Sequence, residues 1–166
     1  MSNVWNVHLQ DGGSAQIRLS QVHELVSHVQ AADNGQIADL VGGDFNCTPD
    51  SPLYEELSNS LGPSVQQLSG AHPFVTWDGL STKPGAGETL DHIFVRARGL
   101  FQNLQAAPRV VFEAASLKQR LSDHLGIEAV LNLGRGPSLA GTLSSPRATS
   151  QLPAVATRQV SYAVRE

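Results

Sequence analysis

The chain has a single cysteine, Cys47, among its 166 residues, and this scarcity excludes two classes of small protein. One thiol cannot form an internal disulfide, so the fold is not a disulfide-stapled scaffold, and it cannot supply a multi-cysteine zinc module. A lone thiol is compatible with a reducing compartment. We therefore expect a cytoplasmic protein whose core is held together by packing.

Long apolar runs are also missing from the sequence. A membrane-spanning helix needs about 18 or more consecutive apolar residues, and no segment approaches this length. Residues 1–8 lack the basic and apolar regions of a secretory signal, so the sequence predicts no transmembrane or export segment. With 166 residues and 40% hydrophobic side chains, the chain has the size of one domain and enough apolar material for a packed core.

Basic residues are scarce in most of the chain. Residues 1–133 contain 7 Lys and Arg against 14 Asp and Glu, whereas residues 134–166 contain 4 Arg against 1 Glu. Affinity for the phosphate backbone of nucleic acids comes mostly from Lys and Arg. The acidic body therefore disfavours a long nucleic-acid footprint, although bound metal ions could supply positive charge locally.

Hydrophobic periodicity predicts strands and helices along the first 133 residues. Ser14 is a suitable N-cap for an amphipathic helix, and Ser51 followed by Pro52 is typical of the start of another. We predict, in chain order, a strand over 4–9, a helix over 15–31, a strand over 37–41 that runs into a Gly-rich loop, a helix over 52–62, and strands over 74–77, 90–95, 109–113 and 126–133.

The last part of the chain differs in composition from the rest. Gly, Pro, Ser, Ala and Thr dominate residues 134–166 without a steady period. Such a composition favours a flexible tail, in which residues 159–164 are the one candidate strand. We therefore divide the chain into a folded α/β domain over 1–133 and a tail over 134–166.

Four polar clusters lie at the ends of predicted strands, where open α/β sheets usually hold their functional sites. Each cluster taken singly has an ordinary structural explanation, such as a turn, a helix cap or a solvated strand residue. The functional interpretation therefore depends on their occurring together. The clusters are His8, Asp44 with Asn46, Asp91 with His92, and Asp123 with His124.

The residue types in these clusters suit phosphate chemistry. In extended backbone Asp44 and Asn46 point to the same side, which suits the holding of a phosphate or a metal-bound water. Asp123 is a hard oxygen ligand of the kind that Mg²⁺ prefers, and His124 is of a type that titrates near neutral pH. Asp91 could orient an imidazole that acts as a general base. Together they indicate metal-assisted phosphoester hydrolysis.

The order of these motifs resembles that of the endonuclease/exonuclease/phosphatase superfamily, which includes DNase I-like nucleases, abasic-site endonucleases, inositol polyphosphate 5-phosphatases and neutral sphingomyelinases. The resemblance spans about residues 3–133, and the stretch 87–95 is more similar to the sphingomyelinase-type and general bacterial branch than to the abasic-endonuclease branch. The motifs are Asn-Val-His-Leu at 6–9, Gly-Asp-Phe-Asn at 43–46, Leu-Asp-His-Ile-Phe at 90–94 and Ser-Asp-His at 122–124.

The resemblance implies both a fold and a role for each site residue. The fold would be half of a four-layer α/β/β/α sandwich of DNase I type, with a mixed, mainly antiparallel sheet and flanking helices. His124 would handle the proton of the attacking water, Asp91 would orient its imidazole, and His8 would hydrogen-bond a phosphate oxygen. The catalytic residues would be His8, Asp44, Asn46, Asp91 and His124, and the ligands of Mg²⁺ or Mn²⁺ would be Asp123 and Asp44.

The chain also departs from the family pattern. The first half of the family, which supplies an Asn, the main metal-binding Glu and one of two facing sheets, has no counterpart here. We therefore expect one sheet to expose an apolar inner face, which would favour self-association or a complementing chain.

Two hypotheses about function remain open from the sequence. One is a Mg²⁺-dependent phosphodiesterase or phosphatase that acts on a small or lipid phosphoester, with nucleic acid less favoured. The other is a catalytically deficient, truncated fragment that acts as a binding or partner-complementing module.

Overall fold

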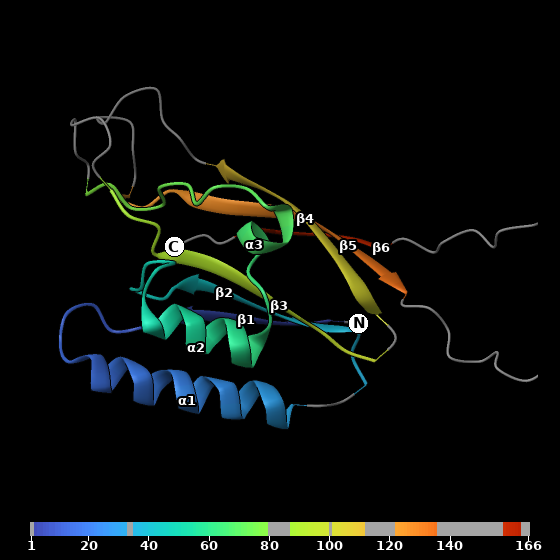
Figure 1. Ribbon diagram of the computed structural model, residues 1–166, viewed down its shortest axis with the longest axis horizontal. Coiled ribbons are helices and arrows are strands. Elements are labelled where there is room, and N and C mark those ends of the chain that lie inside the picture. Colours follow the sequence, from blue (N-terminus) through green and yellow to red (C-terminus); the bar gives the residue numbers. More distant parts are fainter. Residues whose placement is uncertain are drawn as a thin grey trace, which may run out of the picture.

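The computed structural model describes residues 2–32, 35–79, 87–99, 101–111, 122–135 and 158–163. Strands and helices alternate at the start of the chain, and the later part is mostly β (Figure 1). The elements are β1 (Ser2–His8), α1 (Ala15–Ala31), β2 (Ala38–Asp44), α2 (Pro52–Leu61), α3 (Val65–Ser69), β3 (Asp91–Ala97), β4 (Phe101–Val111), β5 (Gly126–Arg135) and β6 (Arg158–Ala163).

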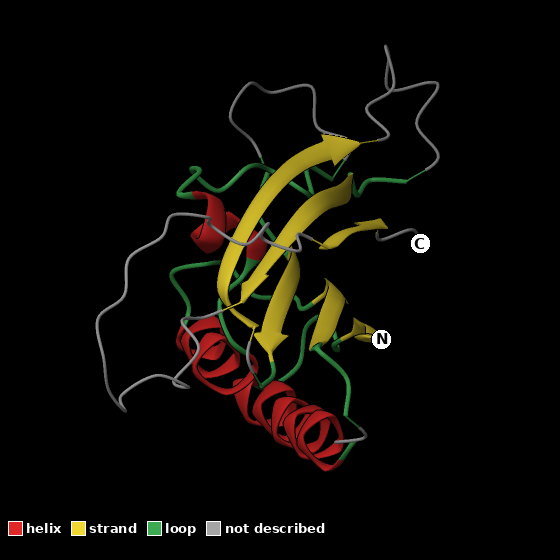
Figure 2. Cartoon of the chain, turned by 90° about the vertical axis from the view of Figure 1, so that its right-hand side faces the viewer, coloured by secondary structure: helices red, strands yellow, loops and turns green. Residues whose placement is uncertain are grey.

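The described strands form two three-stranded sheets. In the first sheet, ordered β1-β2-β3, β1 runs parallel to β2 and β3 runs antiparallel to it. In the second sheet, ordered β4-β5-β6, both pairs are antiparallel. Helices α1 and α2 cover one side of the first sheet, and the second sheet lies on its other side (Figures 1 and 2). The predicted mixed α/β fold with flanking helices is confirmed.

Alternation along the central strands explains why the first sheet is covered on both sides. Successive side chains of a strand point to opposite faces. In β2, Val41 belongs to the cluster formed with α1 and α2, whereas Leu40 belongs to the cluster formed with β5. In β3, Phe94 faces the helices and Ile93 faces the second sheet. The first sheet is therefore the middle layer of the described structure.

The two longer helices begin where the sequence predicts. The side chain of Ser14 accepts a hydrogen bond from the backbone N–H of Ile17, and that of Ser51 accepts one from Tyr54. Each bond satisfies a donor that the first helical turn leaves without an intrahelical partner. Helix α1 covers the predicted range 15–31, and α2 ends one residue before Gly62.

Three elements differ from the predictions. Helix α3 is missing from them because five residues are too few to show a period, although Ser64 and Gln67 form a capping box. Residues 74–77 form no strand and contribute only isolated bridges at Trp77. Strand β4 begins at Phe101 rather than at 109 and tolerates Pro108 because it is an edge strand. Residues 112 and 113 of the predicted strand lie outside the described residues.

The end of the chain contributes one described strand. The candidate strand at 159–164 corresponds to β6, which pairs with β5. The division at residue 133 between a domain and a tail stays a prediction. Among the helices of the described segments, none is long and apolar enough to cross a membrane.

The expectation of an exposed apolar sheet face is wrong for the middle of the first sheet. Leu40, Ile93 and Val95 are at most 1% exposed, because residues of β5 pack over them. The reason is that β4, β5 and β6 form a second sheet that covers this face. On the edge strand β1, Val4 is 53% exposed. The buried face gives no support for self-association through it.

Candidate active site

Strand register brings three predicted site residues into one row. His8 is the register partner of Asp44 across the parallel pair, and Asp44 is the partner of Asp91 across the antiparallel pair. These positions lie at one end of the first sheet, where β1 and β2 end and β3 begins.

His8, Asp44 and Asp91 are far apart in the sequence but adjacent in space, because strand pairing places them side by side. The side chains of Asp44 and Asp91 share the parity of Leu40 and Ile93 in their strands, so they point toward the second sheet. The row therefore faces the segment that leads into β5.

A tight turn after β2 brings Asn46 back toward Asp44. Gly43 precedes the turn and allows β1 to approach closely, since a Cβ at this position would lie 1.9 Å from the carbonyl oxygen of Val7. Asn46 has a φ of 48°, in the left-handed region, and its backbone N–H donates to Asp44 Oδ1 over 2.8 Å. The shared orientation of Asp44 and Asn46 is thus produced by a turn, and not by extended backbone as predicted.

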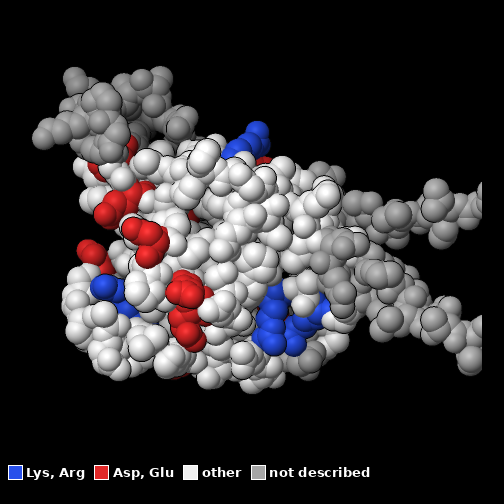
Figure 3. Space-filling view, in the orientation of Figure 1, with Lys and Arg blue, Asp and Glu red and all other residues white. Residues whose placement is uncertain are grey.

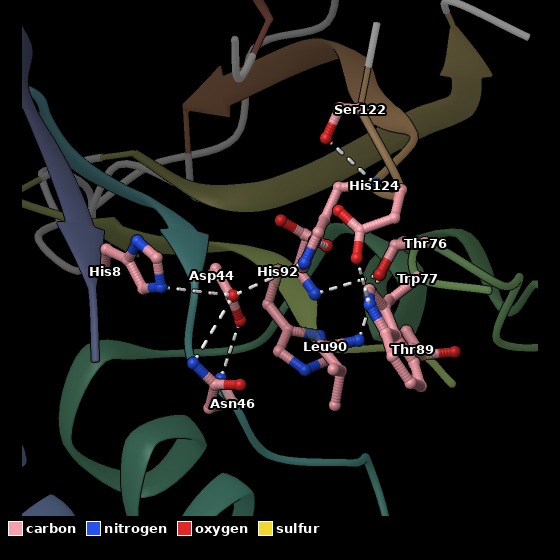
Figure 4. Close-up of polar contacts among 12 residues, drawn as sticks. His8, Asp44, Asn46, Thr76, Trp77, Thr89, Leu90, His92, Ser122 and His124 are labelled. Atoms are coloured by element: carbon pink, nitrogen blue, oxygen red, sulfur yellow. Dashed lines mark hydrogen bonds and ion pairs between the residues drawn. The ribbon is translucent and has the colours of Figure 1, made fainter. Parts of the chain in front are cut away.

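The carboxylate of Asp44 is the meeting point of the cluster (Figure 4). Its Oδ2 lies 3.3 Å from Asn46 Nδ2, 3.5 Å from His8 Nε2 and 3.8 Å from His124 Nε2. Burial raises the pKa of Asp44, and the nearby negative charge of Asp91 raises it further, while the Asn46 N–H and the two histidines lower it. An approaching cation would be favoured at this carboxylate.

The side chains of His124 and Asp91 are in direct contact. His124 Nδ1 lies 2.9 Å from Asp91 Oδ2, and because a carboxylate only accepts, Nδ1 carries the proton and donates it. This tautomer leaves Nε2 as the basic nitrogen, on the side of the ring toward Asp44. The His124 side chain is 16% exposed, so the pair is partly shielded from water.

Thr76 and Trp77, which the sequence did not indicate as site residues, make hydrogen bonds to Asp91 and Asp123. The hydroxyl oxygen of Thr76 accepts from the backbone N–H groups of Leu90 and Asp91, and the indole N–H of Trp77 donates to Asp123 Oδ2 over 2.9 Å. Neither residue carries a charge or belongs to a motif used in the prediction. Their place just before the loop that leads to Asp91 was the one available signal.

His92 lies outside the site, although the sequence groups it with Asp91. Its parity in β3 is that of Phe94, so its ring points into the core between the first sheet and the helices. Its Nε2–H donates to the carbonyl of Cys47, and burial lowers the pKa of His92 to about 4. Cys47 is buried too, which raises the pKa of its thiol to about 12. Both residues are part of the core.

The acidic residues of the cluster supply part of a magnesium site. Mg²⁺ commonly binds to one or two carboxylates and completes its coordination with waters and substrate phosphates. Asp44 and Asp123 are carboxylates of this kind. Across the described segments, however, no three His, Cys, Asp or Glu side chains form a group that could hold a metal ion. The donor chemistry therefore fits Mg²⁺ if substrate or another segment supplies the remaining ligands.

Fold and site together define an α/β protein whose polar cluster combines carboxylates with histidines at the edge of a sheet. A model of the Endonuclease/Exonuclease/phosphatase family matches residues 4–124, so the chain belongs to this family. The members of the family are hydrolytic phosphoesterases. A search of curated proteins finds no match.

Solved structures share the fold at low sequence identity. An endonuclease/exonuclease/phosphatase from Bacteroides vulgatus is 21% identical, with a TM-score of 0.60 over 76% of this chain and 47% of that one. TDP2 from D. rerio, complexed with a single-strand DNA product, is 19% identical, with a TM-score of 0.59 over 77% and 54%. A Staphylococcus aureus beta toxin with bound magnesium ions is 24% identical, with a TM-score of 0.52 over 76% and 51%. The chain thus spans about half the length of these structures.

Proposed function

We propose that the chain carries the catalytic cluster of a divalent-metal-dependent phosphoester hydrolase, in which His124 moves the proton of the attacking water. The observation that carries this proposal is the Asp91–His124 pair, 2.9 Å apart, whose basic nitrogen lies on the side of Asp44. Family membership supports the reaction class. The match covers about half of each of the solved structures.

We assign the transferred proton to a particular atom of His124. With Nδ1–H donated to Asp91, His124 accepts a proton at Nε2 from a water beside Asp44. The carboxylate of Asp91 then stabilises the imidazolium that forms. When Nε2 carries the proton beforehand, it donates that proton to the leaving oxygen instead, so the same nitrogen serves as base or acid.

His8 and Asn46 are proposed to bind the phosphate. The side chain of His8 is 64% exposed and lies 3.5 Å from Asp44, so it can reach a substrate oxygen without leaving the cluster. Asn46 is fixed by its hydrogen bonds to Asp44 and to the carbonyl of Leu9, which is 2.7 Å away. The Asn46 N–H that makes the longer bond to Asp44 is the one that would exchange this bond for a phosphoryl oxygen and stabilise the charge that develops there.

Asp44 and Asp123 would hold Mg²⁺ or Mn²⁺ together with ligands from outside the described cluster. When bound, the ion would polarise the phosphoryl group and offset its charge. The raised pKa of Asp44 supports this assignment, because a cation relieves the repulsion between buried carboxylates.

A small or lipid phosphoester is proposed as the substrate, ahead of nucleic acid. On the face seen in Figure 3, acidic side chains are spread over its left and centre, whereas basic side chains gather in separate patches. This distribution lacks the continuous basic surface that a long nucleic-acid footprint needs. The DNA product bound to the D. rerio relative makes nucleic acid the comparison substrate of choice. A cytoplasmic location stays a prediction.

The test compares hydrolysis by the parent chain with that of His124→Gln and Asp91→Asn, in the presence of Mg²⁺ or Mn²⁺. The substrates are bis-p-nitrophenyl phosphate, sphingomyelin, inositol phosphates and nicked DNA. We expect both variants to lose about 10²- to 10⁴-fold in rate, since each removes general acid-base catalysis. His72→Gln is the matched control, because His72 is exposed and outside the cluster.

Equal rates in the parent and in His124→Gln would reject the proposal. Absence of metal-dependent turnover of every substrate would favour the second hypothesis, a binding module without catalysis. The specific observation behind this alternative is that the described residues form no complete group of metal ligands.

A further inference from the structure

The candidate site is assembled from two different sheets. His8, Asp44 and Asp91 lie on strands of the first sheet, whereas Asp123 and His124 precede β5 of the second sheet. Packing between sheets is apolar and non-directional, so it does not by itself fix polar atoms within a few tenths of an ångström. The Asp91–His124 hydrogen bond joins the two halves directly, and further polar contacts are needed to hold its two partners in place.

The segment Thr76–Trp77 supplies such contacts through its backbone. Trp77 forms isolated antiparallel bridges with Glu88, which leads into β3, and with His124, which leads into β5. The carbonyl of Thr76 accepts from the N–H of Leu125 over 2.6 Å. One short segment thus hydrogen-bonds to the loop before each of the two strands.

The side chains of the same two residues reach the acidic residues of the site. Thr76 is fully buried, and its hydroxyl accepts from the N–H of Asp91 over 3.0 Å and from the N–H of Leu90 over 2.9 Å. Trp77 Nε1 lies 2.9 Å from Asp123 Oδ2. Thr76 therefore fixes the backbone of Asp91, and Trp77 fixes the carboxylate of Asp123.

We propose that Trp77 and Thr76 are positioning residues that set Asp123 and Asp91 relative to each other across the two sheets. The inference rests on the proposed function, because it assigns these residues to the same site. Trp77 acts by occupying one carboxylate oxygen of Asp123 with a fixed donor, which limits the directions open to the other oxygen. Residues that orient metal ligands or bases in this way typically change affinity or activity by about 10- to 100-fold when replaced.

The first test removes only the indole donor, with Trp77→Phe. The matched control is Trp5→Phe, because the indole N–H of Trp5 is buried without a hydrogen-bond partner among the described residues. We expect Trp77→Phe to weaken Mg²⁺ binding, measured by calorimetry on the full chain, by about 10- to 100-fold. Trp5→Phe is expected to bind Mg²⁺ as the parent does. Equal affinities in the two variants, or no saturable binding by the parent, would overturn the proposal.

A spectroscopic readout reports on the hydrogen bond without any turnover. The proton NMR spectrum of the parent should show two indole N–H resonances, one from Trp5 and one from Trp77. Added Mn²⁺ is expected to broaden the Trp77 resonance first. Asp123→Asn is expected to move the Trp77 resonance and to remove its preferential broadening, while the Trp5 resonance stays in place. A Trp77 resonance that is unaffected by Asp123→Asn would overturn the assignment.

The second test separates the hydroxyl of Thr76 from its packing. Thr76→Val removes the acceptor at nearly constant shape, and Thr76→Ser retains it with a smaller side chain. We expect the valine variant to lose about tenfold or more in kcat with KM little changed, and the serine variant to recover most of the loss. Equal losses in both variants would assign Thr76 to packing.

The two proposals fail in different ways. If His124→Gln abolishes hydrolysis while Trp77→Phe and Thr76→Val behave as the parent, the proposed function stands and the positioning role is rejected. If His124→Gln retains full activity, the proposed function itself is rejected.

Discussion

Strand β2 carries a buried aspartate at each end, and the two are treated differently by the fold. Asp39 is fully buried near the start of the strand, and Asp44 is 3% exposed at its end. Because they are five residues apart, regular alternation places their side chains on opposite faces of the sheet. Asp39 points toward the helices, and Asp44 points toward the second sheet.

Asp39 has a permanent counter-ion. Arg98 donates from Nε over 2.7 Å and from a terminal nitrogen over 2.6 Å, both to Asp39 Oδ2. Asn3 and Gln36 donate to the other carboxylate oxygen, over 3.1 Å and 3.3 Å. Arg98 also donates to the carbonyl of Val29, near the end of α1. The carboxylate is saturated, and the network attaches the helix to the sheet.

Asp44 has partners of another kind. The ion pairs that the described residues give it are with His8 and His124, and neither histidine carries a permanent charge. Its neighbour in register, Asp91, is a second acid, and the pKa of Asp44 is raised. The comparison teaches that the fold neutralises a carboxylate it uses for structure, and leaves the carboxylates of the site to be neutralised by something that binds.

The largest effect on stability is expected at Asp39, the carboxylate whose hydrogen bonds are saturated. Arg98→Met leaves the buried charge of Asp39 without its counter-ion, and we expect unfolding to become easier by about 3 to 5 kcal/mol. Urea unfolding followed by circular dichroism measures the change. Replacing both partners, in Arg98→Met with Asp39→Leu, should recover most of the loss, since it removes the unpaired charge as well.

A second ion pair provides the control for this prediction. Arg109 and Glu128 are 2.8 Å apart on neighbouring strands, and the Arg109 side chain is 71% exposed. Pairs of this kind contribute about 1 kcal/mol or less, so Arg109→Met should leave the unfolding midpoint nearly unchanged. A similar loss at Arg98 and Arg109 would show that burial does not separate the two pairs.

A smaller effect is expected from His92, which lies beside Asp91 but faces the core. The unfolded chain takes up a proton at this residue near pH 6.5, whereas the folded chain does so only near pH 4. The stability from the neutral, buried ring is therefore complete above about pH 6.5 and is lost as the pH falls toward 4. The loss amounts to about 3 kcal/mol, from 1.36 kcal/mol per pKa unit.

The measurement for His92 is the slope of unfolding free energy against pH between 7 and 4. His92→Asn is expected to flatten this slope relative to the parent, whatever its effect on the absolute stability. His23→Asn, at an exposed position on α1, should keep the slope of the parent. Parallel slopes in the parent and His92→Asn would contradict the neutral, buried state of the ring.

Much of this comparison could be predicted from sequence, because it follows from strand period and capping. Ser14 and Ser51 marked the helix starts, and the order of polar clusters indicated the residues that meet at Asp44. The period of two also separates Asp91 from His92, since Ile93 and Phe94 face opposite cores. Asp91 and His92 form one cluster in the sequence because they are adjacent, although the period of two puts them on opposite faces.

The rest depended on contacts that local sequence does not encode. The second sheet, which buries Leu40 and Ile93, required the pairing of β4 with β5 and of β5 with β6. The Trp77–Asp123 hydrogen bond joins residues 46 positions apart, and Trp77 lies in no regular strand. Non-local pairing of this kind leaves no periodic signal in the segments that it joins.

The smallest effect is expected at Asp44 itself and distinguishes it most directly from Asp39. Because the folded pKa of Asp44 is raised, its ionised form costs stability at neutral pH, so Asp44→Asn should unfold at a higher urea concentration than the parent. Mg²⁺ at ten times its dissociation constant should stabilise the parent by about 1.4 kcal/mol and leave Asp44→Asn unchanged. Asp50→Asn, at an exposed position in the next loop, should respond to Mg²⁺ as the parent does. Equal Mg²⁺ stabilisation of the parent and Asp44→Asn would mean that Asp44, like Asp39, has no need of a bound cation.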